Sequence, residues 1–280
     1  MKILCLFVRF GEDHHAGSLD VLNAWYERHG LREARTLWIV DNALAPDTPP
    51  RALGPRDWLR AGDNSAWEFS AWERALREAE GEPFDLVHFV TSSFNTLYTG
   101  YLGHFRPEML QAVNTRRVCL GHIDGHPSGF ELGGRHFDRW LRTCFFFLNR
   151  RDALAVRTWV AFGQADLLFA SSGTIEFRRE APLSEAYRRH VTAWLRGAEI
   201  GGHRWHSPVA GGTGEVRRFQ SKALAITNEH ALSLTLRDAG LALADLCWLH
   251  LQPAPANPSA RVAPEKEQVE ARNRFLGIPG

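Results

Sequence analysis

The chain has little of what marks several large protein classes. Its 280 residues include only four cysteines, and no two of them form the C-x-x-C pair of zinc and redox motifs. Cys5, Cys119, Cys144 and Cys247 are widely spaced within apolar runs, which indicates buried free thiols in a reducing compartment. The first apolar run ends at Arg9, too soon for a signal peptide, and no run approaches the length of a membrane span. We therefore expect a soluble cytoplasmic protein, for which peripheral contact with a membrane stays open.

An excess of charge of one sign is also lacking. The sequence has 33 Lys and Arg against 32 Asp and Glu, a formal net charge of +1. This balance argues against non-specific binding to nucleic acid, so we expect no nucleic-acid partner. Lys2, Lys222 and Lys266 are the only lysines. The remaining cations are arginines, which suit bidentate contacts to phosphate or carboxylate, although a nucleotide-composition bias of the genome is the plainer explanation.

Common motifs of nucleotide and ester chemistry are absent. There is no G-x-x-x-x-G-K-[ST] and no G-x-G-x-x-G after the first apolar run, which argues against P-loop enzymes and dinucleotide dehydrogenases. The nucleophile elbow G-x-S-x-G is missing as well. The composition is 44% hydrophobic and 23% charged, as in ordinary globular proteins, and this excludes disordered and fibrous classes.

The N-terminal part alternates short apolar runs with amphipathic stretches. Strands buried on both faces are predicted over Lys2–Phe10, Thr36–Val40 and Leu86–Val90, with helices between them over Leu19–His29 and Trp67–Glu80. Such alternation with short connections predicts an α/β fold with a parallel sheet joined by right-handed crossovers.

The later part is less regular. We expect a strand over Arg117–His122, a buried aromatic stretch over Phe137–Leu148, a helix over Leu183–Leu195 and a mobile glycine-rich loop over Gly201–Gly214. A strand or helix over Phe219–Ala225, a helix over Glu229–Gly240 and a final strand over Ala244–Leu251 follow. Residues 253–280 are rich in proline and then in charge, and we expect them to form a surface tail or to be partly disordered, which leaves 1–252 as the domain.

Polar residues follow three of the predicted strands. They are Arg9–His15, Asp41 with Asn42, and Thr91–Ser93. Ligands of open α/β sheets bind in the crevice beyond the carboxyl ends of parallel strands. We therefore expect a pocket where these three segments meet.

Four stretches follow one another in a recognisable order. They are W-I-V-D-N-A-L at Trp38–Leu44, G-D-N-S-A-W-E-F-S-A-W-E-R-A-L at Gly62–Leu76, N-E-H-A-L-S-L-T-L-R-D-A-G at Asn228–Gly240, and L-C-W-L-H ending at His250. Together they resemble the GT-A class of nucleotide-sugar glycosyltransferases. The second stretch is similar to the N-x-G-x-x-F-x-A-W element of rhamnan-synthesis transferases, and the third to the family's E-D-x-D-L-x-x-R-x-x-x-x-G helix. The resemblance covers most of residues 1–250.

The resemblance implies a GT-A-like, Rossmann-like α/β domain with a mixed, mainly parallel sheet flanked by helices. Such a domain would move a sugar from a nucleotide-sugar donor to a glycan or glycolipid acceptor in polysaccharide biosynthesis. The resemblance also implies that Asp41 contacts the nucleotide and that His250 can ligand a metal. Asp63 and Asn64 would bond the nucleotide, or would instead cap the helix that follows them.

The chain departs from the family where the donor diphosphate would bind. Thr91-Ser92-Ser93 stands in place of the Asp-x-Asp that holds a divalent cation, Mg²⁺ or Mn²⁺, and hydroxyls are poorer ligands for such cations than carboxylates. Either the transfer is metal-free, with Lys222 or Arg204 as the counter-charge, or the activity is lost. Ser92 and Ser93 remain candidates for donor binding.

An inverting transfer needs a carboxylate that removes a proton from the acceptor hydroxyl and a group that stabilises the leaving diphosphate. Glu229 is the candidate base, although the family's neighbouring Asp is His230 here. The alternative for Glu229 is a residue at the start of a helix, where the helix dipole favours an acid.

Two further segments are candidates for acceptor contacts. If the strand continues, His122, Asp124 and His126 share one face, a geometry that a transition metal accepts; a sugar-contacting loop and internal hydrogen bonding are the alternatives. Trp205, in the glycine-rich loop, is a candidate aromatic platform for a sugar. Two rival functions are a non-catalytic relative that binds nucleotide-sugars or carbohydrate, and a structural partner in a polysaccharide-assembly complex.

Overall fold

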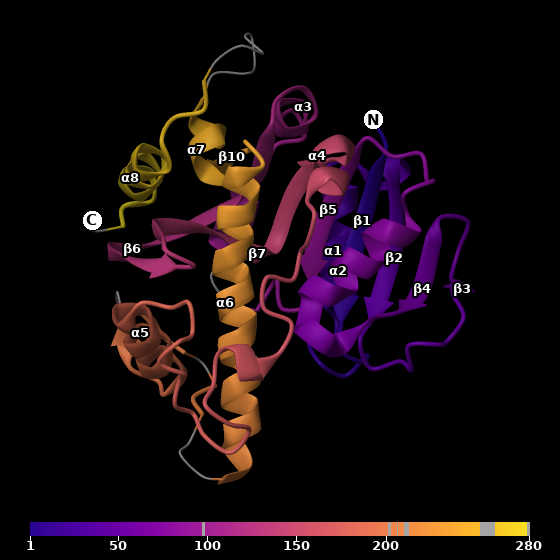
Figure 1. The fold of residues 1–280 in the computed structure, drawn as a ribbon. Coiled ribbons are helices and arrows are strands. Elements are labelled where there is room, and N and C mark those ends of the chain that lie inside the picture. Colours follow the sequence, from indigo (N-terminus) through magenta and orange to yellow (C-terminus); the bar gives the residue numbers. More distant parts are fainter. Residues whose placement is uncertain (97–98, 201–202, 206, 210–212, 253–260, 279–280) are drawn as a thin grey trace.

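The computed structural model describes residues 1–96, 99–200, 203–205, 207–209, 213–252 and 261–278. A mixed sheet of eight strands runs through the molecule in the order β10-β6-β7-β5-β1-β2-β4-β3 (Figure 1). Helices cover both faces of this sheet. The predicted α/β class with a mixed, helix-flanked sheet is confirmed.

The strands of this sheet are β1 (Ile3–Arg9), β2 (Arg35–Asp41), β3 (Arg51–Ala52), β4 (Asp57–Ala61), β5 (Leu86–Thr91), β6 (Val118–Leu132), β7 (Arg135–Asn149) and β10 (Ala242–Asp245). The helices are α1 (Ser18–Arg28), α2 (Trp67–Glu78), α3 (Met109–Thr115), α4 (Arg150–Ala155), α5 (Glu185–Leu195), α6 (Val216–Asp238), α7 (Leu246–Leu251) and α8 (Glu265–Leu276). A small ladder joins β8 (Glu199–Ile200) to β9 (His203–Arg204).

Strands β1, β2, β4 and β5 run parallel, whereas β7 is antiparallel to both of its neighbours, β5 and β6. β10 is parallel to β6. The carboxyl ends of β1, β2, β4, β5, β6 and β10 therefore lie at one edge of the sheet. This edge is called the carboxyl edge below.

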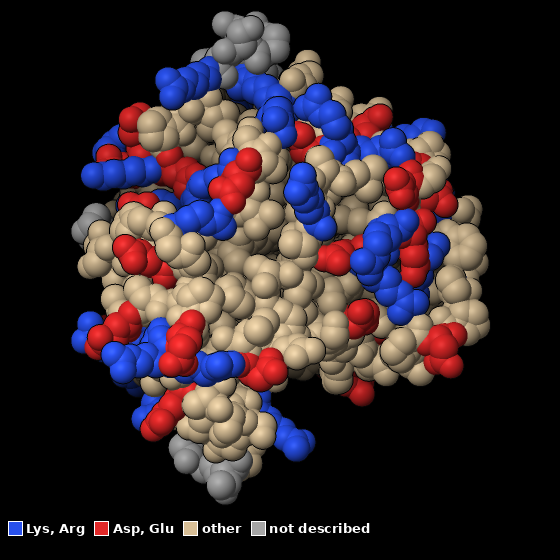
Figure 2. Space-filling view, in the orientation of Figure 1, with Lys and Arg blue, Asp and Glu red and all other residues tan. Residues whose placement is uncertain are grey.

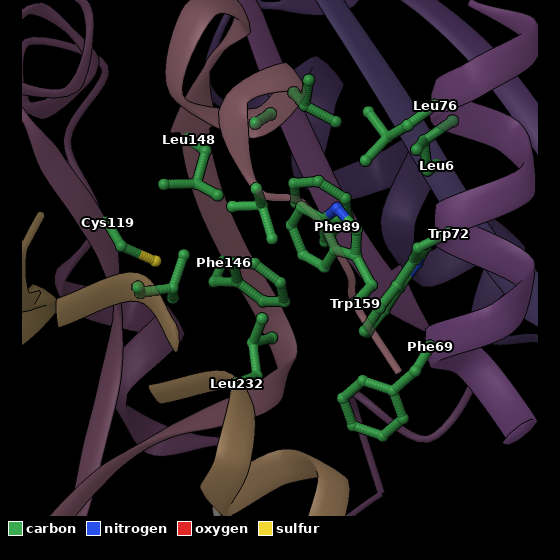
Figure 3. Close-up of a cluster of buried hydrophobic side chains, with 14 of the residues drawn as sticks. Leu6, Phe69, Trp72, Leu76, Phe89, Cys119, Phe146, Leu148, Trp159 and Leu232 are labelled. Atoms are coloured by element: carbon green, nitrogen blue, oxygen red, sulfur yellow. The ribbon is translucent and has the colours of Figure 1, made fainter. Parts of the chain in front are cut away.

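The alternation of side chains along β1 explains why the sheet is buried on both faces. Leu4 and Leu6 belong to the cluster under α2, and Cys5 and Phe7 to the cluster under α1. On the α2 side, Phe69, Trp72 and Leu76 follow helical spacing and face the sheet residues Leu6, Phe89 and Phe146, with Trp159 among them (Figure 3). Full burial of each such side chain contributes about 1.5–3 kcal/mol.

Helix α6 corrects the predicted boundaries near the candidate base. It is one continuous helix of 23 residues, so the separate element predicted over Phe219–Ala225 does not exist. Glu229 lies well inside this helix rather than at its first turn. The alternative interpretation of Glu229 as an acid favoured by the helix dipole is therefore wrong.

The C-terminal part departs from the prediction in two ways. The strand β10 ends at Asp245, whose Oδ1 caps α7 by accepting a hydrogen bond of 3.1 Å from the Trp248 backbone N–H. The final strand predicted over Ala244–Leu251 is thus mostly a helix. The expected surface tail contains α8, which packs on β10: the Gln268 amide donates to the carbonyl of Leu243 and accepts from the backbone N–H of Asp245.

Among the helices that the structure describes, none combines the length and the apolar character needed to span a bilayer. The predicted mobile loop Gly201–Gly214 lies partly outside the described residues, and its described part includes β9.

Candidate functional site

The site is built around the point where the chain changes direction across the sheet. From β1 the chain passes to β2 and β4 on one side and then crosses to β5 on the other side of β1. Ligands of such sheets bind in the crevice between the loops at this switch. The loops after β1 and β5 meet there, because His15 Nδ1 lies 3.2 Å from Thr96 Oγ1. His15 has a φ of 59°, a left-handed conformation that is costly for a residue other than glycine.

Glu229 reaches the same edge from helix α6. The pairing of β5 with β7 ends at Val90 and Phe145, so Thr143 lies at the carboxyl edge, just past the end of this ladder. Both the backbone N–H and the hydroxyl of Thr143 donate to Glu229 Oε2, at 3.0 and 2.7 Å. The half-buried Glu229 carboxylate is therefore fixed at the edge predicted to bind ligand.

The surroundings of Glu229 bring its proton affinity close to neutrality. Burial raises the pKa of Glu229 to about 7, the hydrogen bonds from Thr143 oppose this rise, and the negative charges of Asp124 and Glu68 add to it. A carboxyl group with a pKa near neutral pH is suited to general acid or base catalysis.

Asp124 is held as an anion beside Glu229. The Arg142 guanidinium binds it in a bidentate pair, with Nε 2.9 Å from Oδ2 and Nη2 2.8 Å from Oδ1. His122 Nε2 lies 3.2 Å from Oδ1. Burial alone would raise the pKa of Asp124, but Arg142 and His122 outweigh it and keep this pKa well below its usual range. With 27% of its side chain exposed, Asp124 remains open to solvent or a ligand.

The C-terminal helix α8 supports strand β6, which carries Asp124. Arg272 of α8 donates from Nη1 to the carbonyl of Ile123 at 2.6 Å and to Asp245 Oδ2 at 2.8 Å. Asp245 is fully buried, and His122 Nδ1 lies 3.7 Å from its Oδ2. The Tyr101 ring stacks on the His122 ring with centroids 4.7 Å apart. Strand β6 is thus held in place by a residue from the predicted tail.

Lys222 of α6 and Glu68 of α2 are two further charged residues of the site. Lys222 Nζ lies 3.9 Å from the centroid of the Trp67 ring. Burial lowers the pKa of Lys222 and the nearby charge of Glu68 opposes this, whereas burial raises the pKa of Glu68. Trp67 has a φ of 58°, and strained backbone of this kind gathers at functional sites.

Three of the predicted site residues, Glu229, Asp124 and Lys222, influence one another through their charges rather than through direct contacts: the charge of Asp124 acts on Glu229. The charge of Glu68 acts on both Lys222 and Glu229. Sequence reasoning treats Glu68 only as an acid in the first turn of a helix. Its position beside the strained Trp67 depends on backbone geometry that the sequence pattern does not report.

The Asp41 carboxylate is bound by groups of the protein itself. Its carboxylate accepts hydrogen bonds from Arg9 Nε at 2.8 Å, from the Gly11 N–H at 2.8 Å and from the Ala43 N–H at 3.0 Å. Only 4% of its side chain is exposed. The carboxylate that the resemblance assigns to nucleotide binding is therefore buried and already hydrogen-bonded to these three groups. We assign Asp41 to bracing the ends of β1 and β2.

The other residues predicted to bind the nucleotide-sugar donor differ in their hydrogen bonds and in their exposure. Asp63 Oδ1 accepts from the Ser65 backbone N–H at 2.9 Å and so caps the short 3-10 turn Asn64–Ala66. Helix α2 itself begins after Ala66 without a side-chain cap, so capping of the Trp67 helix by Asp63 or Asn64 is wrong. Asn64 is exposed, and its Oδ1 accepts from Asn42 at 3.3 Å. Ser92 is buried, whereas Ser93 is exposed at the end of β5. Asn64 and Ser93 are therefore the reachable members of this group.

The candidate metal ligands do not gather into a centre. The ring of His126 packs against His190 of α5, with centroids 5.0 Å apart, rather than joining His122 and Asp124. His250 lies on α7, where its Nδ1 is 2.7 Å from the His104 carbonyl oxygen. Within the described ranges, no group of three or more His, Cys, Asp or Glu side chains is arranged to hold a metal ion. The placement of His250 at a strand end was wrong because that segment is helical.

Trp205 is half-buried, and its ring lies 6.2 Å from that of Trp194 on α5. Arg204 is exposed on β9. Residues 206 and 210–212 of the same predicted loop lie outside the described residues. The contacts of Trp205 thus tie it to α5.

Comparison with protein-family models finds none that matches this chain, and comparison with curated proteins finds no similar sequence. The chemistry of the carboxyl edge is therefore the basis for a functional proposal.

Proposed function

We propose that the chain is a GT-A-like glycosyltransferase that moves a sugar from a nucleotide-sugar donor to a glycan or glycolipid acceptor in cytoplasmic polysaccharide biosynthesis. The observation that carries the proposal is Glu229, a carboxyl group with a pKa of about 7 held at the carboxyl edge by Thr143. The order of β4, β2, β1 and β5 supports it, because this arrangement forms nucleotide crevices in doubly wound sheets. The ordered resemblance to rhamnan-synthesis transferases supports it further.

In the proposed inverting reaction, the acceptor hydroxyl attacks the anomeric carbon of the donor sugar. Glu229 takes the hydroxyl proton as the new carbon–oxygen bond forms, and the electron pair of the broken bond goes to the nucleoside diphosphate. Lys222 would stabilise the negative charge that develops on this leaving group. Asp124, paired with Arg142, would accept hydrogen bonds from sugar hydroxyls.

A divalent cation does not fit the residues at the end of β5. The groups there are hydroxyls, and Thr91 Oγ1 and Ser93 Oγ lie 3.0 Å apart in a hydrogen bond with each other. Mg²⁺ and Mn²⁺ prefer carboxylate ligands over such hydroxyls. No step of the proposed reaction is therefore assigned to a metal.

The variant Glu229→Gln tests the proposal because it keeps the shape of the side chain and removes the base. The wild-type protein should release nucleoside diphosphate from a panel of nucleotide-sugars in the presence of glycan or lipid acceptors. The variant should lose turnover by roughly 10²–10⁴-fold, the usual contribution of a positioned base, and should still bind donor. Unchanged turnover would remove Glu229 from the mechanism. As a matched control, Glu185→Gln changes an exposed acid on α5 and should have no effect.

A non-catalytic relative is the second candidate, favoured by the residue after Glu229. His230, which stands where the family has an acid, is buried and its Nδ1 lies 2.8 Å from the Tyr187 hydroxyl. Such a protein would be stabilised by nucleotide-sugars in a thermal-shift titration without releasing nucleoside diphosphate. A purely structural partner would show neither stabilisation nor release.

A further inference from the structure

The opposite edge of the sheet carries two arginine doublets. Arg116 and Arg117 directly precede strand β6, and Arg150 and Arg151 directly follow strand β7. Because β6 and β7 are antiparallel neighbours, the start of one and the end of the other lie at the same edge. This edge lies at the other end of the strands from Glu229 and Thr143.

Contacts confirm that the doublets converge. Arg117 Nε lies 3.3 Å and Arg151 Nε 3.6 Å from Asp152 Oδ1. Asp152 itself is 1% exposed, and its other oxygen accepts from Asn149 Nδ2 at 2.6 Å. One arginine of each doublet thus contacts a carboxylate that is enclosed by protein, while half of the Arg117 side chain (50%) is exposed.

A hollow of about 540 Å³ opens beside this cluster. Arg116, Arg117 and Arg261 line it, together with the apolar side chains of Leu243 and Pro264. The acid in its lining, Glu265, is bound by Arg237, whose Nε lies 2.9 Å from Oε1. Figure 2 shows blue side chains gathered along the upper edge of the molecule, over α3 and α4. The hollow is therefore cationic.

The guanidinium groups around this hollow favour a phosphate as ligand. Their planar forks bind phosphate oxygens in bidentate pairs, and several of them around one hollow attract a doubly charged anion more than a single carboxylate. A hollow of this size admits a phosphate or diphosphate group together with part of the molecule that bears it.

We propose that this hollow is a second binding site, specific for a phosphate group, either free in solution or as the headgroup of a phospholipid. The site is separate from the carboxyl edge and does not depend on the function proposed above. Arg116 and Arg261 hold the phosphate, and Arg117 supplies positive potential while it braces Asp152.

Calorimetric titration with inorganic pyrophosphate tests the site. All samples carry Lys222→Gln, so that binding at the carboxyl edge is weakened equally in each. Against this background, Arg116→Gln with Arg261→Gln should weaken pyrophosphate binding at least tenfold, and raising the salt concentration should weaken binding to the parent. The matched control Arg189→Gln removes an arginine on α5 whose side chain is 75% exposed and should change binding less than twofold. Equal binding by the double variant and its parent would overturn the proposal.

If the double variant does not fold, Arg261→Gln alone decides the matter, since its side chain is exposed. It should weaken binding about threefold or more, and an unchanged affinity would overturn the site. Co-sedimentation with vesicles distinguishes the two sources of phosphate. Arginine-dependent binding to phosphatidylcholine vesicles that contain phosphatidic acid, a phosphomonoester lipid, but not to pure phosphatidylcholine, would identify a lipid headgroup. Binding of pyrophosphate without vesicles would identify a soluble phosphate, and binding of neither would exclude the site.

Discussion

Glu229 Oε2 accepts two hydrogen bonds from Thr143, and this pair joins helix α6 to strand β7 at the carboxyl edge. One turn further along the helix, Ser233 Oγ accepts a hydrogen bond of 2.8 Å from the Leu141 backbone N–H. Residues four apart on a helix lie on one face, and residues two apart on a strand point the same way. Alternate backbone N–H groups of β7 are therefore satisfied by side chains of α6, which fixes the candidate base relative to the sheet.

The Thr143 hydroxyl should control the pH at which the protein works. Thr143→Val removes a hydrogen bond that lowers the pKa of Glu229, so this pKa should rise above about 7. Because a base must be ionised, the rise of turnover with pH should move to higher pH. Thr143→Ser keeps the hydroxyl and should leave the pH–rate profile in place. Identical profiles for the valine variant and the wild type would contradict the assignment.

Glu229 should also make the fold less stable as pH rises. Its pKa is about 7 in the folded protein against an ordinary value of 4.5, so between these values the folded state binds more protons than the unfolded state. The stabilisation is therefore complete at low pH and is lost as pH rises through about 7. Glu229→Gln should raise Tm by about 2 °C at pH 8 and leave it nearly unchanged at pH 5. A larger gain at pH 5 than at pH 8 would show the opposite linkage.

Arg272 should be needed for the stability of the site. Arg272→Met leaves Asp245 buried without its cation, which costs about 3–5 kcal/mol of unfolding free energy, as measured by urea denaturation. Combining it with Asp245→Asn should recover part of the loss, because both charges are then gone. Arg274→Gln, an exposed neighbour on α8, should change stability by less than about 0.5 kcal/mol. A neutral Arg272→Met would mean that α8 does not support β6.

Asp41 offers a test that separates a structural role from ligand binding. Asp41→Asn removes the ion pair with Arg9 and should cost about 1–3 kcal/mol of unfolding free energy. Binding of a nucleoside diphosphate, measured by calorimetry at a temperature where both proteins are folded, should stay within about twofold of the wild type. A loss of binding beyond tenfold with unchanged stability would restore Asp41 to the nucleotide site.

The sequence predicts elements that apolar runs or helical spacing mark locally. It does not predict the extent of an element that carries polar side chains into the core. The sequence around β1 is apolar on both faces, and α2 has clear helical spacing, so the sequence predicts both elements. The sequence pattern predicts two separate elements where the structure has the single helix α6, because this helix buries polar residues. Asn228 bonds both the N–H and the carbonyl of Phe162, and His230 contacts Tyr187. Such residues look like a loop boundary in the sequence. In the structure, each has a buried partner from a distant segment.

By itself, the sequence determined the fold class, the buried strands and the edge of the sheet where polar groups gather, because periodicity and apolar content report local burial. Only the tertiary structure decided which of those polar groups meet. Asp41 turns inward to Arg9, whereas Glu229 meets Thr143 from 86 residues away along the chain. Such a pairing depends on strand order and register. These follow from the packing of the whole sheet, which brings α6 against β7 and buries Glu229 where its pKa is raised.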